Sequence, residues 1–279
     1  MAAKEITGKT RVYAHLAHPS AHVRATQTFN RAFREREIDA VAVSIDVAPK
    51  DMPSLVRALK GWRNLAGMGV TMPHKGPIAD ACDEVVGLGR LIGAVNAIRR
   101  EPDGKLVGAN TDGSGFLTGL KRAGHDPAGK RVLLAGVGGA GRAIAFALAH
   151  GGVGELTLAN RTAAKAEEVA AKVAEAFPGT KASVGPPDPT GFDIVVNATP
   201  LGMREGDDLP LDVSKLTPGT VVAEIIIAPE RTRLVEEAER RGCRVHLGLP
   251  MLTCQIDEVI TFLRLDQPAA QPELFTKNP

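Results

Sequence analysis

Residues 131–143 read Arg-Val-Leu-Leu-Ala-Gly-Val-Gly-Gly-Ala-Gly-Arg-Ala, and this stretch decides the fold. The apolar run Val132–Ala135 is typical of a buried parallel strand, and a helix-forming apolar run follows the glycines. Gly136, Gly138 and Gly141 have the G-x-G-x-x-G spacing. The first glycine allows a tight turn, the second lets a pyrophosphate approach the backbone, and the third lets the helix pack on its strand. The stretch therefore predicts a Rossmann domain.

The next expected strand, which starts at Glu155, ends in residues that bear on cofactor choice. An NAD enzyme usually has Asp or Glu there to accept a hydrogen bond from the ribose 2′-hydroxyl. This chain instead has Asn160, Arg161 and Thr162, with Lys165 one helical turn later. These cationic and hydrogen-bonding groups suit a 2′-phosphate, so the predicted cofactor is NADP. The alternative is a solvated basic helix start beside a purely structural glycine turn.

The composition excludes several classes of protein. A chain of 279 residues that is 44% hydrophobic can form two ordinary domains. Its net charge of +2 and 4% aromatic content argue against a nucleic-acid partner. No apolar run approaches about 18 residues and no signal peptide is evident, which predicts no membrane span and a cytoplasmic protein. Cys82, Cys243 and Cys254 are widely spaced and suit reduced thiols, and the histidine spacing predicts no metal site.

The first part of the chain alternates strands and helices. Strands are expected at Arg11–Ala17, Val41–Ile45 and Gly67–Thr71, with helices between them, and a helix ending near residues 87–89 should follow. This order predicts a parallel sheet with helical crossovers. Two further extended pieces, residues 93–99 and 106–110, flank a Pro-x-Gly turn and predict a hairpin.

A second alternating region runs from Arg131 to about His246, and a helix from Met251 through Leu263 finishes the fold. The predicted class is α/β, with an N-terminal α/β substrate domain of parallel type and a Rossmann NADP-binding domain. The substrate domain would span residues 1–112, completed by 247–279, and the Rossmann domain residues 113–246. Ligands should lie at the carboxyl ends of the strands, which places the active site in the cleft between the domains.

Three polar clusters fall at strand ends outside the glycine turn. They are Thr71 with Lys75, Asn96, and residues 110–112. A lysine beside an aspartate can move a proton at a carbonyl or hydroxyl carbon while a nicotinamide carries hydride. From the residues alone, Lys75 equally fits an exposed lysine at a helix start, and Asp112 equally fits a helix N-cap.

Seven ordered blocks cover nearly the whole chain. They are Gly67-x-Gly69-Val70-Thr71-x-Pro73-x-Lys75, Gly93–Asn96, Asn110–Gly113, the Gly136 turn, Asn160–Thr162, Asn197–Met203 and Gly248–Gln255. In this order they resemble the shikimate dehydrogenase family. The resemblance implies a substrate domain, an NADP-binding Rossmann domain and a C-terminal helix that returns to the first domain. It also implies reversible reduction of 3-dehydroshikimate by NADPH, in the shikimate pathway of aromatic amino acid biosynthesis.

The resemblance assigns roles by position. Lys75 matches the catalytic lysine and Asp112 its partner, while Thr71, Asn96 and Gln255 match residues that hydrogen-bond the ring hydroxyls. The expected binding partner is a small-molecule substrate, and the protein is expected to be a monomer or homodimer. The cofactor contacts would come from Gly136, Gly138, Gly139, Ala140, Gly141, Asn160, Arg161, Thr162, Lys165, Thr199, Met203 and Gly248.

The chain departs from the family pattern on the substrate side. The family's H-S-x-S-P stretch, whose serines bind the substrate carboxylate, has Val23 and Ala25 in place of both serines. The usual Asn before Val-Thr is Gly69, and the tyrosine of a D-x-x-Y-x-P segment falls at Ile227. A lost hydrogen bond to a charged group costs roughly 1.5–3 kcal/mol. We therefore expect weak or absent turnover of shikimate, and a related cyclic or less polar alcohol or ketone as substrate.

Several alternatives stay open at this level. Arg24, His22 or Gln27 could restore carboxylate binding if its side chain turns inward. The chain could also be a non-catalytic NADP-binding sensor that kept the fold, although Lys75 and Asp112 both argue against it. A two-domain dehydrogenase acting on a folate-like one-carbon carrier can share the same architecture.

Overall fold

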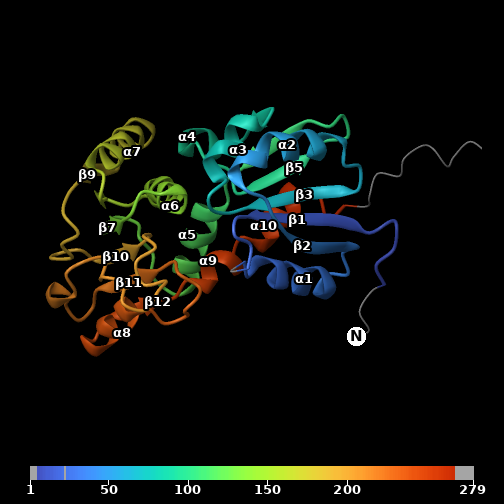
Figure 1. Cartoon of the computed structure of the whole chain (residues 1–279). Coiled ribbons are helices and arrows are strands. Elements are labelled where there is room, and N and C mark those ends of the chain that lie inside the picture. The colour runs from blue at the N-terminus through green and yellow to red at the C-terminus, as the bar shows by residue number, and fades with distance from the viewer. Residues whose placement is uncertain (1–4, 22, 268–279) are drawn as a thin grey trace, which may run out of the picture.

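The computed structural model describes residues 5–21 and 23–267, so the expected tail beyond Gln267 lies outside the described residues. Two bodies are each built on a six-stranded sheet, and helix α5 (Asp112–Arg122) lies between them (Figure 1). Within the described residues, the helices are all too short or too polar to cross a membrane.

The first sheet has the strand order β2-β1-β3-β5-β6-β4. Its strands are β1 (Arg11–Ala17), β2 (Ala40–Asp46), β3 (Leu65–Val70), β4 (Glu84–Val85), β5 (Ala97–Arg100) and β6 (Leu106–Ala109). Strands β1, β2 and β3 are parallel, and β5 and β6 form an antiparallel hairpin, as the sequence predicted. The edge strand β4 was not predicted because two residues are too few to show a periodic pattern.

Helices cover both faces of this sheet. On one face α1 (Ala25–Glu35) packs its aromatic residues against Tyr13 of β1, and on the other α2 (Met52–Gly61) and α3 (Lys75–Ala81) pack against Met68 and Val70. The prediction of a single helix that ends near residues 87–89 was wrong. Instead α3 ends at Ala81, and the short α4 (Gly89–Ile92) follows β4.

The second sheet is fully parallel, with the order β12-β11-β10-β7-β8-β9. This is the doubly wound order of a Rossmann fold, and the order reverses between β7 and β10. The glycine turn follows β7, so it lies at the switch point where dinucleotides bind. The strands are β7 (Arg131–Ala135), β8 (Glu155–Ala159), β9 (Lys181–Val184), β10 (Ile194–Asn197), β11 (Val221–Glu224) and β12 (Arg244–His246).

The helices of the second body are α6 (Gly139–His150), α7 (Ala163–Ala176) and α8 (Arg233–Arg240). Two short 3₁₀ turns complete the elements, η1 (Pro49–Asp51) and η2 (Val213–Lys215). Helix α5 packs against α6 and against α9 (Leu249–Thr253), and its Phe116 and Leu120 are fully buried in the core of the second body. Because α5 begins with Asp112, the packing of this helix also fixes that carboxylate.

The C-terminal segment forms two helices, α9 (Leu249–Thr253) and α10 (Ile256–Phe262), where the sequence pattern predicted one. The prediction was wrong because the apolar period continues across a break at Cys254 and Gln255. The break lies against α5, where a Cβ built on Gly115 would come within 3.0 Å of Gln255 Cβ. Helix α10 then returns to the first sheet, with Val259 and Leu263 in the same core as Tyr13.

Candidate active site

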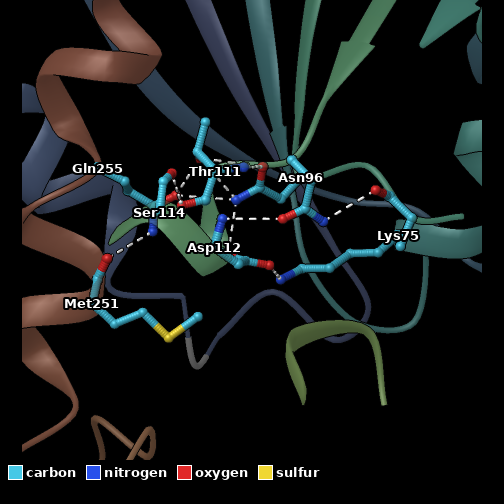
Figure 2. Close-up of polar contacts among 9 residues, drawn as sticks. Lys75, Asn96, Thr111, Asp112, Ser114, Met251 and Gln255 are labelled. Atoms are coloured by element: carbon cyan, nitrogen blue, oxygen red, sulfur yellow. Dashed lines mark hydrogen bonds and ion pairs between the residues drawn. The ribbon is translucent and has the colours of Figure 1, made fainter. Parts of the chain in front are cut away.

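Lys75 and Asp112 meet at the carboxyl ends of the strands of the first sheet. Lys75 is the first residue of α3 and Asp112 the first residue of α5. The Lys75 Nζ donates a hydrogen bond to Asp112 Oδ2 (Figure 2), and the two side chains are only 14% and 7% exposed. Thr111, not Asp112, occupies the N-cap of α5. The carboxylate is therefore directed at the lysine rather than at the helix amides.

Asn96 connects this ion pair to the C-terminal helices. Its Nδ2 lies 2.8 Å from Asp112 Oδ1, 3.0 Å from Gln255 Oε1 and 3.1 Å from Thr111 Oγ1 (Figure 2). Its Oδ1 accepts from the Thr111 amide at 2.8 Å. All four side chains are at least nine-tenths buried. Such a network is rigid because an unpaired polar group there would cost about 1–3 kcal/mol.

Gln255 reaches this network because of the break between α9 and α10. It is the N-cap of α10, its Nε2 donates to Met251 O at 3.0 Å, and its Oε1 accepts from Thr111 Oγ1 at 2.6 Å. The site is thus assembled from three parts of the chain that are far apart in sequence. Thr111 belongs to the polar cluster of residues 110–112 that the sequence analysis noted, but no role of its own was predicted for it.

The two remaining substrate-side candidates lie outside this network. Thr71 directly follows β3, is half-buried, and its backbone amide donates to Leu16 O at 2.9 Å. Arg24 is exposed at the N-cap of α1. It lines an open groove of about 540 Å³, together with Gln27. His22 lies outside the described residues.

That groove runs between the two bodies. One side is formed by α1, and the other by the loop after β11 and by the start of α9. The groove is lined by Arg24, Gln27, Thr28, Arg31, Ile227, Ala228, Pro229, Glu230, Leu249 and Thr253. Arg24 and Arg31 have no ion-pair partner among the described residues.

The glycine turn has the geometry of a phosphate cradle. Gly136 has a φ of +96°, and a Cβ there would lie 2.7 Å from Ala198 O. A Cβ on Gly141 would collide with the Gly136 carbonyl, whereas the space around Gly138 is open. The first and third glycines thus allow close packing, and the second leaves room for a bound group. Gly139 opens α6, and Ala140 follows it in the first turn.

Lys75 lies next to this turn. A Cβ built on Gly139 would be only 3.5 Å from Lys75 Cδ. In the same region Arg142 of α6 donates to Ile92 O at 3.4 Å, which joins the helix to the first body. The described structure therefore has the lysine of one body beside the dinucleotide turn of the other.

The residues after β8 (Asn160, Arg161, Thr162 and Lys165) are those that the sequence analysis predicted to contact the adenosine ribose. Asn160 Oδ1 accepts from the Val137 amide at 3.3 Å, so Asn160 ties the glycine turn to the end of β8. Arg161, Thr162 and Lys165 are exposed at the start of α7. They form a cationic surface at the end of the strand where a 2′-substituent is read.

Glu224 holds two further loops at the cleft. It is fully buried at the end of β11 and accepts hydrogen bonds from Asn197 Nδ2 at 2.9 Å and Thr232 Oγ1 at 2.9 Å. Burial raises the pKa of this carboxyl, and its hydrogen bonds oppose that shift. The Asn197 side chain in turn accepts from the Thr199 amide at 3.0 Å. Glu224 therefore fixes the loop that carries Thr199.

The other two predicted cofactor contacts are Met203, shortly after Thr199 in the chain, and Gly248, the N-cap of α9. Met203 is 38% exposed, and Gly248 is buried where a Cβ would collide with Ile226 O. Within the described residues, no group of histidine, cysteine, aspartate and glutamate side chains is arranged to hold a metal ion.

The four departures from the family pattern all lie on the first body or next to it. Ala25, the first residue of α1, is buried in the core of the first body, and Val23 and Ile227 pack against the same core. No hydrogen-bonding side chain is therefore present at these three positions. Gly69 lies on β3, beside Tyr13 and His15 of β1.

The fold and this site define a class, a two-domain dinucleotide-binding oxidoreductase with a Lys-Asp pair at the cleft. Two family models match the chain, the shikimate dehydrogenase substrate binding domain over residues 16–98 and shikimate/quinate 5-dehydrogenase over residues 120–199. A shikimate dehydrogenase (NADP⁺) from Rubrobacter xylanophilus is 39% identical, with 91% of each chain covered. This chain belongs to the shikimate dehydrogenase family.

Solved structures agree with this assignment. A shikimate dehydrogenase crystallised in complex with NADP⁺ has a TM-score of 0.87 and 34% identity, with 94% of this chain and 92% of that chain covered. The ligand-free 5-ketofructose reductase of Gluconobacter sp. strain CHM43 has a TM-score of 0.82 and 34% identity, with 92% and 94% covered. The fold therefore occurs in relatives named for different substrates.

Proposed function

We propose that this chain is an NADP-dependent oxidoreductase that catalyses reversible hydride transfer between NADP(H) and a cyclic hydroxy or keto compound. The observation that carries the proposal is the position of the Lys75–Asp112 pair beside Gly139 of the dinucleotide turn. Membership of the shikimate dehydrogenase family and the likeness to NADP-dependent relatives support the same activity and cofactor. The sensor alternative is not favoured.

The residues of the glycine turn fit NADP. The open space at Gly138 suits a pyrophosphate, and the amides at the start of α6 suit its charge. Arg161 and Lys165 would contact the 2′-phosphate, with Asn160 and Thr162 as hydrogen-bonding neighbours. Thr199, Met203 and Gly248 would contact the nicotinamide half. NADPH supplies the hydride when it is bound.

In this mechanism Lys75 holds a proton at the substrate oxygen. As a ketone is reduced, its oxygen gains negative charge, and the Lys75 ammonium donates to it and transfers a proton. Asp112 keeps the ammonium in place through its Oδ2, while its Oδ1 is held by Asn96. Asn96, Thr71 and Gln255 would bind substrate hydroxyls. In the reverse direction, Lys75 accepts the proton from the alcohol.

The substrate is expected to differ from shikimate at the end where the carboxylate would lie. Val23, Ala25 and Ile227 are apolar and pack into a core, so they offer no hydrogen bond to an anion. A site without these donors loses affinity for a carboxylate. We expect weak or absent turnover of shikimate, with Arg24 and Gln27 of the groove as the remaining groups for an acidic substituent.

Steady-state assays test this function. Absorbance of the reduced nicotinamide is followed with shikimate and quinate plus NADP⁺, and with 5-ketofructose plus NADPH. The wild type should turn over at least one compound, and Lys75→Ala should be inert while still binding NADPH. A micromolar KM for shikimate would contradict the substrate expectation. Equal inertness of both proteins, each binding NADPH, would support the sensor instead.

The organisation of the molecule is part of the proposal. The substrate domain comprises residues 1–112 with 247–279, and the NADP domain residues 113–246. The free thiols of Cys82, Cys243 and Cys254 are compatible with a cytoplasmic location. The working unit is a monomer or homodimer, which light scattering of the purified protein at assay concentration would determine.

A further inference from the structure

A polar side chain lies beside Gly69, the position where the family pattern has an asparagine. His15 of β1 and Gly69 of β3 are direct neighbours in the parallel register. A Cβ built on Gly69 would lie 2.5 Å from His15 Nδ1 and would collide with the Tyr13 hydroxyl. The backbone of Gly69 does not have a positive φ, so the tight fit at this position comes from the neighbouring side chains and not from the backbone conformation. The two ring side chains occupy the volume that an asparagine side chain would need.

Strand geometry places His15 on the face of the first sheet that α1 covers. Side chains alternate along a strand, so Tyr13 and His15 share one face. The rings of Tyr13 and Phe29 of α1 contact each other in a tilted arrangement, with centroids 4.6 Å apart, so this is the face that α1 covers. His15 is closer than Tyr13 to the carboxyl end of β1, and it is half-buried whereas Tyr13 is 2% exposed. The histidine therefore lies between the aromatic core and the cleft.

The same cluster lies near the catalytic pair. Burial and the negative charge of Asp112 both raise the pKa of Tyr13, so its hydroxyl stays protonated and within electrostatic reach of that carboxylate. Tyr13 and His15 have ring centroids 6.3 Å apart. Gly69 is two residues before Thr71, which the family pattern assigns to substrate binding. His15 thus neighbours both Tyr13, whose hydroxyl is affected by the charge of Asp112, and the strand that leads to Thr71.

Beyond His15 the wall of the site continues with uncharged hydroxyls. Ser44 of β2 is the register neighbour of His15 on the other side, and its Oγ lies 2.5 Å from Thr26 Oγ1 of α1. The neighbouring positions Val23 and Ala25 add only apolar surface. This row offers groups that can donate to and accept from hydroxyl and carbonyl oxygens. This row of hydroxyls suits neutral oxygens, whereas Arg24 and Arg31 of the neighbouring groove are the groups that could bind an acidic substituent.

We propose that His15 is a specificity-determining residue that hydrogen-bonds a hydroxyl or carbonyl oxygen of the substrate in place of the amide missing at position 69. A hydrogen bond from His15 would favour an uncharged polyhydroxy ketone, or the corresponding alcohol, as substrate over a ring compound that carries a carboxylate. The inference rests on the proposed function, because it concerns the substrate of the same site.

The test compares His15→Ala, His15→Gln and wild type, with 5-ketofructose and NADPH as the uncharged probe and shikimate and NADP⁺ as the acid probe. The wild type should have the larger kcat/KM with 5-ketofructose. His15→Ala should raise the KM for it about tenfold, the factor that one hydrogen bond is worth, with kcat within about threefold. His15→Gln retains a donor and an acceptor and should recover most of the loss. His125→Ala, a half-buried histidine beyond α5, is the matched control and should change neither constant.

The outcomes separate the inference from the function on which it rests. If His15→Ala leaves the KM unchanged or lowers kcat alone, the role of His15 is overturned while the oxidoreductase stands. If shikimate is preferred and Arg24→Ala abolishes that preference, the uncharged substrate class is overturned. If the wild type binds NADPH but turns over neither probe, both the role of His15 and the uncharged substrate class are overturned. If His15→Ala is unfolded by circular dichroism, equal KM values for His15→Gln and His15→Leu would overturn the role.

Discussion

The Asp112→Asn substitution tests the central pair of the site most directly. The carboxylate serves two donors at once, since Oδ2 accepts from Lys75 Nζ and Oδ1 accepts from Asn96 Nδ2 at 2.8 Å. An asparagine at this position has one oxygen and one NH₂ group, so it can accept from only one of the two directions. If the oxygen keeps its bond to Asn96, the NH₂ group faces the ammonium, and both would be donors.

The size of the effect follows from burial. Lys75 is 14% and Asp112 7% exposed, so water compensates only partly for the lost counter-charge. We expect the free energy of unfolding to fall by about 2–3 kcal/mol, near the lower end for a broken buried pair, because the longer lysine can move toward solvent. The kcat should fall by about a hundredfold or more, since the proton donor is no longer held at the substrate oxygen.

The assay measures kcat with the best substrate of the panel and the dissociation constant of NADPH by fluorescence titration. NADPH binding should change by no more than about twofold, because Asp112 contacts Lys75 and Asn96 and not the glycine turn. Asp126→Asn, an exposed residue paired with Lys121 at 3.7 Å, is the matched control and should behave as wild type. A kcat for Asp112→Asn within about threefold of wild type would refute the proposed arrangement.

Two other predictions concern cofactor choice and stability. Arg161→Ala should weaken NADP⁺ binding about tenfold and should hardly affect NAD⁺ binding. The factor is low for a charge-assisted hydrogen bond because Arg161 is exposed. Equal losses of affinity for both cofactors would exclude a contact between Arg161 and the 2′-phosphate. Burial lowers the pKa of His246 to about 4. As the pH falls from about 6.5, this histidine is therefore protonated in the unfolded chain before it is protonated in the folded one. The free energy of unfolding should drop by about 2–3 kcal/mol toward pH 4. His246→Gln should flatten that part of the stability curve in urea titrations, and an unchanged slope would show that other groups cause it.

Local patterns in the sequence predicted the elements whose structure depends on near neighbours. Strand β1 has the predicted bounds Arg11–Ala17, and the hairpin of β5 and β6 forms around its Pro-x-Gly turn. These predictions succeeded because alternation, apolar runs and turn residues act over fewer than about ten positions. The helix break before Gln255 and the short strand β4 have no comparable local signal.

The sequence by itself determined the glycine turn of residues 136–141, because φ values and close backbone contacts there depend on which residues lack a Cβ. It also determined which polar residues lie at strand ends. Only the tertiary structure decided that Asn96 contacts Gln255, 159 positions away, and that the His15 side chain lies against Gly69. Such contacts depend on how sheets and helices pack against each other, and the periodicity of a single segment carries no information about its distant partners.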